Sequence, residues 1–195
     1  MSHHIYHTRG IILGSIAIGE ANRFYKIFTE ELGLVWVSAQ SVRMEKSKLR
    51  YSLQHYVWVT LDLVKGREVW RITSAQEDVI HTILRTDTKH FKMFAEICAL
   101  VSRMVHGERQ EEGLFKDLFE LANFLEQKEI PDDLVQSFQV FASARVLAWL
   151  GYFDDSLNEQ FTKTDKWSID MLKIFEKERE AVSLKIDEAL HASHL

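Results

Sequence analysis

Residues 53–63 read LQHYVWVTLDL, and this stretch decides the fold of the N-terminal part of the chain. Aliphatic residues alternate there with polar or aromatic ones at a period of two, which predicts a strand with one buried face. Residues 65–67 read as a turn, and residues 69–73 as the returning arm of a hairpin. The first structural unit is therefore expected to be built on a β-sheet.

The residues upstream of this stretch also favour strands. Residues 8–18 and 34–39 are two further strand candidates. Residues 22–31 are ambiguous, because Phe24, Ile27 and Phe28 fit a helical stripe while the β-branched and aromatic content also allows a strand. Five short strands in about 75 residues suit a small barrel.

After residue 76 the apolar period becomes helical. Pro131 stands where a helix would start, with two acidic residues in the first turn that suit the helix dipole. The stretch after it is nearly apolar all round, so this helix should be central and buried. The expected helices cover residues 89–106, 114–125, 134–150 and 165–190. The fold class is α+β, with one domain over residues 1–76 and a helical one over 77–195.

Charge divides the chain at the same boundary. Residues 1–76 contain 10 Lys/Arg and 6 Asp/Glu, a net of +4, and residues 77–195 contain 14 Lys/Arg and 23 Asp/Glu, a net of −9. The first part is basic and the second strongly acidic. The overall charge of −5 hides this asymmetry.

Several classes of protein are excluded by the composition. Cys98 is the single cysteine, so no internal disulfide and no multi-cysteine zinc site can form, and a packed core thiol is expected. No apolar run reaches about 18 residues and the N-terminus lacks a signal-peptide pattern, so we expect a cytoplasmic protein without a membrane anchor.

The sequence also lacks the marks of an enzyme. It shows no nucleophile motif, phosphate loop or dinucleotide fingerprint, so neither catalysis nor a cofactor is expected. His3, His4 and His7 have no cysteine or acidic residue nearby to complete a metal site, and no metal is expected there. Arg145 lies within the apolar helix and requires a carboxylate or a ligand, of which an internal salt bridge is favoured.

Basic residues concentrate where the chain leaves the third strand. Four cations, Arg43, Lys46, Lys48 and Arg50, lie within eight residues and are opposed by Glu45 alone. A second group, Lys65, Arg67 and Arg71, lies at the hairpin. In a small barrel these loops could face one phosphate backbone, with Tyr56 and Trp58 stacking on bases. The alternative is a solvated loop, with both aromatic rings covered by the helical domain.

The order of these elements resembles the bacterial RecO family. The matching stretches are TRGIIL at 8–13, GEANR at 19–23, IFTEELG at 27–33, RMEKSKLR at 43–50 followed by Leu53-Gln54, GR at 66–67, WRIT at 70–73, RVL at 145–147 and LGY at 150–152. The resemblance covers residues 5–76 and returns at 141–152. It implies an N-terminal OB-fold followed by a helical domain, and it favours a strand for residues 22–31.

The resemblance also implies a function. RecO proteins are non-catalytic recombination mediators that bind single- and double-stranded DNA, anneal complementary strands and work with RecR to load RecA on gaps. They also contact the acidic tail of the single-stranded-DNA-binding protein, and they work in the cytoplasm at the nucleoid. The DNA-binding residues expected here are Arg43, Lys46, Lys48 and Arg50, helped by Arg23, Lys65, Arg67 and Arg71.

The chain also departs from the family pattern. Many RecO proteins carry a four-cysteine zinc module after the LGY motif, whereas residues 153–164 contain no cysteine, so no zinc is expected. The chain is shorter than typical members, and residues 39–42 are less basic than usual. The acidic helical part favours one alternative, a protein-interaction adaptor that kept the fold and does not bind DNA.

Overall fold

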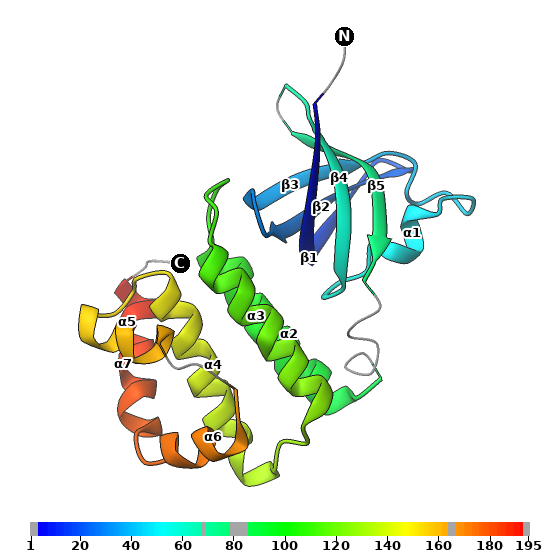
Figure 1. Ribbon diagram of the computed structural model, residues 1–195. Coiled ribbons are helices and arrows are strands. Elements are labelled where there is room, and N and C mark those ends of the chain that lie inside the picture. Colours follow the sequence, from blue (N-terminus) through cyan, green and yellow to red (C-terminus); the bar gives the residue numbers. More distant parts are fainter. Residues whose placement is uncertain (1–3, 68, 79–85, 164–166, 193–195) are drawn as a thin grey trace. The chain divides into compact units, whose positions relative to one another are not determined.

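The computed structural model describes residues 4–67, 69–78, 86–163 and 167–192 (Figure 1). The chain divides into two compact units. Residues 1–82 and 105–115 form the first, and residues 83–104 and 116–195 form the second. Each unit has its own hydrophobic core.

The first unit is a closed five-stranded barrel with the strand order β1-β2-β3-β5-β4 (Figure 1). Its strands are β1 (Ile5–Ile18), β2 (Asn22–Thr29), β3 (Gly33–Ala39), β4 (Trp58–Lys65) and β5 (Trp70–Glu77), with the short helix α1 (Leu49–Ser52) between β3 and β4. The long β1 pairs with β4 through its first half and with β2 through its second half, and a short parallel pairing of β3 with β5 closes the barrel. This arrangement confirms the expected OB-fold.

The alternation of side chains along the strands builds the barrel core. Ile12, Ile27, Val35, Val37 and Leu61 point inward and are completely or almost completely buried. A Cβ atom at position 10 would lie 2.8 Å from Ile27 Cγ2 and 3.1 Å from the Phe28 carbonyl oxygen, so this close approach of β1 to β2 requires glycine.

Two strand predictions change in detail. Residues 22–29 form a strand, because their inward residues complete the barrel core, and the helical stripe is accidental. The strand predicted from residue 53 begins only at Trp58, because the chain first leaves α1 and turns at Tyr56, whose φ is 62°. Leu53 and Val57 are buried in the barrel core from this connection, which explains why they continue the apolar pattern.

Residues 105–115 belong to the barrel unit although they lie between two helices in the sequence. The Leu34 N–H donates to the Gly107 carbonyl at 3.0 Å, and the Phe115 ring packs edge-to-face on Phe28 and Trp58. Trp58 is only 2% exposed. Trp58 is therefore not on an open face; the alternative holds for this ring, because Phe115, which the sequence analysis assigned to the helical part, covers it.

The second unit is helical. Its elements are α2 (Thr88–Met104), α3 (Glu112–Gln127, of which residues 112–115 belong to the barrel unit), a 3₁₀ turn (Asp132–Leu134), α4 (Val135–Trp149), α5 (Asp155–Thr162), α6 (Ile169–Phe175) and α7 (Arg179–Ala192). The apolar helix α4 is buried, as expected, and packs against α2, α5, α6 and α7. Cys98 is fully buried on α2, which confirms the core thiol.

The predicted long C-terminal helix is wrong, since α6 and α7 are separate. With 15 residues, α4 is about 22 Å long, and a straight helix over residues 165–190 would extend far beyond it. The chain instead turns at residues 176–178, where Glu176 accepts hydrogen bonds from Ser137 of α4 and from Arg179. Both short helices therefore pack against α4. Helix α5, capped by the Asp154 side chain, was also not expected.

Candidate nucleic-acid interface

The basic loop, which we define as residues 40–50, runs from the end of β3 into the first residues of α1. Two hydrogen bonds fix its start: Ser41 N–H donates to the side-chain Oδ1 of Asn22, the first residue of β2, at 2.9 Å, and Arg43 N–H donates to the Ala21 carbonyl in the β1–β2 turn at 3.0 Å. The Arg43 guanidinium also donates to the Gly19 carbonyl at 2.7 Å. The loop is therefore anchored at one end while its cations face solvent.

The other three cations of the basic loop are exposed. Lys46 and Lys48 lie in the loop and Arg50 lies on α1, which packs against β5. None of the three forms an ion pair with any residue that the structure describes. Glu45, the one acidic residue of the loop, is also exposed. The loop consequently presents uncompensated positive charge.

Lys65, at the end of β4, is already paired. Its ammonium lies 2.8 Å from Glu108 Oε2 and 5.0 Å from the centre of the Trp70 ring, while Glu108 Oε1 accepts a hydrogen bond from Trp70 Nε1 at 2.9 Å. The hydrogen bond with Glu108 raises the pKa of Lys65, and the one with Lys65 lowers the pKa of Glu108. Glu108 therefore neutralises one of the cations expected to meet a ligand.

The remaining three predicted cations differ in accessibility. Arg67, in the β4–β5 turn, and Arg71, on β5, are exposed. Arg23 is half-buried at the end of the barrel, where its guanidinium donates to Ser15 Oγ at 2.9 Å and Ser15 Oγ lies 3.0 Å from His55 Nε2. Arg23 thus supports the barrel end more than it faces solvent.

The exposed aromatic residues are not those that the sequence singled out. Trp58 is buried, and Tyr56 is half-buried in a turn beside His55. Trp36, on the outer side of β3, is 42% exposed. The sequence already indicated that Trp36 is exposed, because Trp36 takes the outward position in the alternation of residues 33–39, between the inward Val35 and Val37.

The helical unit contains a buried ion pair. The buried Arg145 donates from Nε and Nη2 to the two carboxylate oxygens of Asp117, at 2.7 and 2.6 Å, which confirms the expected salt bridge. Asp117 also accepts hydrogen bonds from the indole N–H groups of Trp149 and Trp167, each at 3.1 Å. This carboxylate therefore joins two helices and the segment before α6.

One group of described side chains has the composition of a metal site. The ligand atoms of Asp87, His90 and Glu129 lie within 4.8 Å of one another. His90 Nδ1, however, bonds Asp87 Oδ2 at 2.9 Å, its Nε2 accepts the Ile130 N–H at 3.4 Å, and Lys89 Nζ lies 3.7 Å from Glu129. Both histidine nitrogens already have partners within the protein, and Asp87 caps the start of α2 by accepting hydrogen bonds from the N–H groups of Lys89 and His90.

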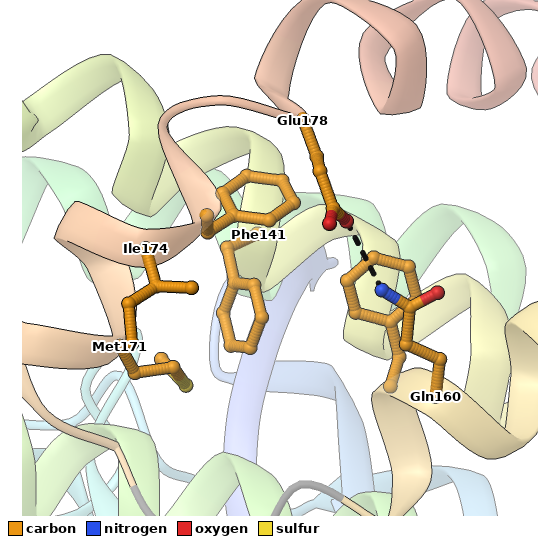
Figure 2. A pocket seen from close by; sticks show the side chains of 7 residues that line it. Phe141, Gln160, Met171, Ile174 and Glu178 are labelled. Atoms are coloured by element: carbon orange, nitrogen blue, oxygen red, sulfur yellow. Dashed lines mark hydrogen bonds between the residues drawn. The ribbon is translucent and has the colours of Figure 1, made fainter.

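An apolar pocket of about 140 Å³ lies among α4, α5, α6 and the turn before α7 (Figure 2). Phe141, Met171 and Ile174 face it, and Ile174 is 72% exposed. Its rim carries Glu178, which accepts a hydrogen bond from Gln160 at 3.1 Å. A carboxylate at this position opposes the capture of an acidic peptide.

Among the described helices, none has the length and hydropathy needed to cross a membrane.

The barrel with its basic loop and the attached helical unit define an OB-fold protein with a helical extension. Residues 1–77 match the family model described as "Recombination protein O N terminal". The chain is similar to the DNA repair protein RecO of Trichodesmium erythraeum, with 32% identity over 71% of this chain and 48% of that protein. The RecO proteins of Gloeothece citriformis and Thermodesulfovibrio yellowstonii are 30% and 28% identical, over 66% and 78% of this chain and 46% and 60% of theirs.

Residues 1–77 belong to the family of N-terminal domains of bacterial RecO proteins. The chain spans about half the length of the curated relatives quoted first. The similarity is not confined to the barrel, since an alignment over 138 residues must include part of the helical unit.

Proposed function

We propose that this protein is a DNA repair and recombination mediator that binds single- and double-stranded DNA through its barrel, promotes strand annealing and helps to load RecA on gaps. The observation that carries the proposal is the basic loop, whose Lys46, Lys48 and Arg50 are exposed without an ion-pair partner among the described residues. The names of the curated relatives support the same function.

The mechanism is phosphate neutralisation without base-specific readout. Lysine and arginine that contact phosphates displace condensed counterions, and this release drives binding to any sequence. Arg43, Arg67 and Arg71 extend the basic loop, while Arg23 and Lys65 contribute less because Ser15 and Glu108 already engage them. Neutralised strands repel each other less, so complementary strands can pair.

The proposed partners follow from the family. An OB-fold protein that coats strands acts with a RecR-like protein and with the single-stranded-DNA-binding protein at gaps. The proposal includes no chemical step on DNA and no cofactor. Association at the nucleoid would then follow from DNA binding itself.

Fluorescence anisotropy tests the proposal with labelled oligonucleotides of about 30 nucleotides, single- and double-stranded, over a salt series. Affinity should fall linearly on a log–log plot, with a slope of about −0.7 per phosphate contacted on single strands. The triple variant K46A/K48A/R50A should bind more weakly and with a flatter slope. K173A/K177A/K185A removes the same charge from the helical unit and serves as the matched control. An unchanged affinity and slope in the first variant would remove the basic loop from the mechanism.

The alternative is an adaptor that kept the fold and does not bind DNA. The net charge of −9 over residues 77–195 and the Glu108–Lys65 ion pair favour it, since both reduce the positive field of the chain. A pull-down with a RecR-like protein, together with no retention of either oligonucleotide at low salt, would select this alternative.

A further inference from the structure

The floor of the apolar pocket in the helical unit consists of three phenylalanine rings. Phe141 of α4 packs edge-to-face on Phe161 of α5, with the ring centres 5.6 Å apart, and on Phe175 of α6 at 5.0 Å. The rings of Phe161 and Phe175 also meet each other, at 6.1 Å. None of the three is more than 5% exposed, so the floor belongs to the folded core and is formed before any ligand binds.

The mouth of this pocket is apolar and accessible. Ile174 faces the pocket from α6 and is nevertheless 72% exposed (Figure 2). Met171 faces it from one turn earlier, and its unbranched thioether can adapt to the shape of a ligand. The volume of about 140 Å³ is close to that of an engineered cavity of roughly 150 Å³ that binds benzene. The pocket therefore has room for one aromatic ring or one leucine side chain.

The rim of the pocket carries a carboxylate without a cationic partner. Glu178 is exposed, and its Oε2 accepts a hydrogen bond from the neutral amide of Gln160 at 3.1 Å (Figure 2). Over the part of the chain that the structure describes, no cation forms an ion pair with this carboxylate. A carboxylate can accept several hydrogen bonds, so the contact with Gln160 leaves room for a cation from a ligand.

The other charges around the pocket do not compensate Glu178. Lys177 is exposed but is not one of the residues that line the pocket. The net charge of residues 77–195 is −9. Three cations of the surrounding segments form ion pairs with acids close by in the sequence: Lys163 with Glu159, Lys173 with Asp170, and Arg179 with Glu176. A ligand that enters the pocket therefore meets a negative rim.

We propose that this pocket binds a basic segment of a partner protein, in which a phenylalanine or leucine side chain enters the pocket and an adjacent lysine or arginine pairs with Glu178. The affinity comes from the apolar side chain, because its burial against the three rings removes apolar surface from water. The choice of partner comes from Glu178, because a carboxylate at the rim attracts a basic segment and repels an acidic one.

This docking site goes beyond the proposed function and does not depend on it, since all of its residues lie in the helical unit. One anchored side chain and one ion pair make a small interface, so the complex is weak and transient. The helical unit can then hold a protein partner while the barrel is free for DNA.

The test uses short fluorescent peptides with one central phenylalanine, flanked by arginines in a basic peptide and by aspartates in an acidic one. By anisotropy with the full chain, the basic peptide should bind about tenfold or more tightly than the acidic peptide. Replacement of its phenylalanine by alanine should remove most of the binding, because the ring is the anchor. About 0.1 M salt is used, since its Debye length of about 10 Å weakens the attraction of distant charges.

Two charge variants assign the selectivity to the rim. Glu178→Lys should reverse the preference, so that the acidic peptide binds more tightly than the basic one. Glu188→Lys makes the same change in net charge at an exposed position of α7 that does not line the pocket, and it should keep the wild-type preference. Thermal melts of both variants check that the helical unit is folded.

Methyl NMR spectra show where the peptide binds. The basic peptide should shift the methyl signals of Met171 and Ile174 by the ring current of its phenylalanine. The signals of Met93 and Met104, which are buried on α2, serve as the reference and should stay in place. The alanine peptide should leave all four unchanged.

Four outcomes would overturn the inference. If neither peptide binds, the pocket takes no apolar anchor. If the acidic peptide binds wild type as tightly as the basic one, Glu178 does not select the partner. If the alanine peptide binds as well as the basic peptide, the attraction is general and does not use the pocket. If sedimentation shows a wild-type dimer that Glu178→Lys dissociates, a second copy occupies the pocket instead. The oligonucleotide titrations are separate measurements, so a failure here leaves the proposed function standing.

Discussion

Two arginines show how differently this chain uses positive charge. Arg145 lies buried in the helical unit, and Asp117 accepts two hydrogen bonds from its guanidinium. Arg50 lies exposed on α1 in the basic loop, where no described residue forms an ion pair with it. The fold itself provides the counterion for the first and leaves the second to solvent or a ligand. Mutation at the first site should therefore lower the stability of the fold, whereas mutation at the second should lower the affinity for a ligand.

This difference predicts which substitutions change the free energy of unfolding and which change the affinity for a ligand. A buried charge that loses its partner retains its desolvation cost, so removal of the partner destabilises the whole domain. An exposed cation loses little free energy when it is removed, and the change appears in ligand affinity instead. The three changes below probe a buried pair, a helix cap and a barrel pair, in decreasing order of expected effect.

The largest effect is expected for Asp117→Ala. This change leaves Arg145 buried without its carboxylate and also removes the acceptor of two indole N–H groups. We expect a loss of about 3–5 kcal/mol in the free energy of unfolding, measured by urea denaturation of the full chain. Asp133→Ala, which removes an exposed carboxylate from the same unit, is the control and should cost far less. A comparable loss in both variants would show that the pair carries no special role.

A second variant sharpens this result. Arg145→Met together with Asp117→Leu replaces both charges by apolar side chains, so no buried charge lacks a partner. The double variant should be more stable than Asp117→Ala. A double variant less stable than Asp117→Ala would mean that the indole hydrogen bonds, rather than the ion pair, dominate the site.

Local pattern was sufficient to predict most of the fold. The alternation at residues 57–63 predicted β4, and the apolar stretch after Pro131 predicted the central helix α4. The errors lie where tertiary packing overrides local pattern. Residues 165–190 carry a continuous helical stripe, yet the contact of Glu176 with Ser137 accompanies a turn that no local residue type announces.

The candidate site was predicted in part. The basic loop is visible in the sequence because its cations are clustered, and the structure finds them exposed. The partner of Lys65 could not be predicted, since Glu108 is 43 residues away in the sequence and reaches the barrel only through the packing of residues 105–115. The same packing buries Trp58, whereas Trp36 and Tyr51, which the sequence analysis did not single out, are exposed.

A smaller effect is expected for Asp87→Ala at the start of α2. Asp87 Oδ1 accepts hydrogen bonds from the N–H groups of Lys89 and His90 at 2.9 and 3.2 Å, so its loss should cost about 1 kcal/mol. The hydrogen bond from the His90 N–H lowers the pKa of Asp87. Because the pKa of Asp87 is depressed in the folded state, this stabilisation is present at neutral pH. It is lost as the pH falls below the pKa of an ordinary aspartate, about 3.9, toward the lower pKa of the folded state.

Thermal melts of wild type, Asp87→Ala and Asp87→Asn between pH 7 and pH 3 check this prediction. Asparagine keeps the side-chain oxygen without the charge, so Asp87→Asn should retain most of the stability at neutral pH and lose less of it on acidification than wild type. If wild type and Asp87→Ala lose stability in parallel as the pH falls, the carboxylate does not contribute as described.

Glu108→Gln is expected to have the smallest effect on the stability of the fold. It should raise the affinity for DNA rather than lower it. Glutamine can still accept the Trp70 N–H, but it no longer neutralises Lys65, so this cation joins those of the basic loop. Stability should change by less than about 1 kcal/mol because the pair is exposed. Affinity for oligo(dT) should rise a few-fold at low salt, and the slope of log affinity against log salt should be steeper by about 0.7 if Lys65 contacts one more phosphate.

Glu120→Gln makes the same change in net charge on α3 in the helical unit and should leave the slope unchanged. Equal slopes in both variants would mean that Lys65 lies outside the path of the strand, and the barrel would then bind through the basic loop without Lys65.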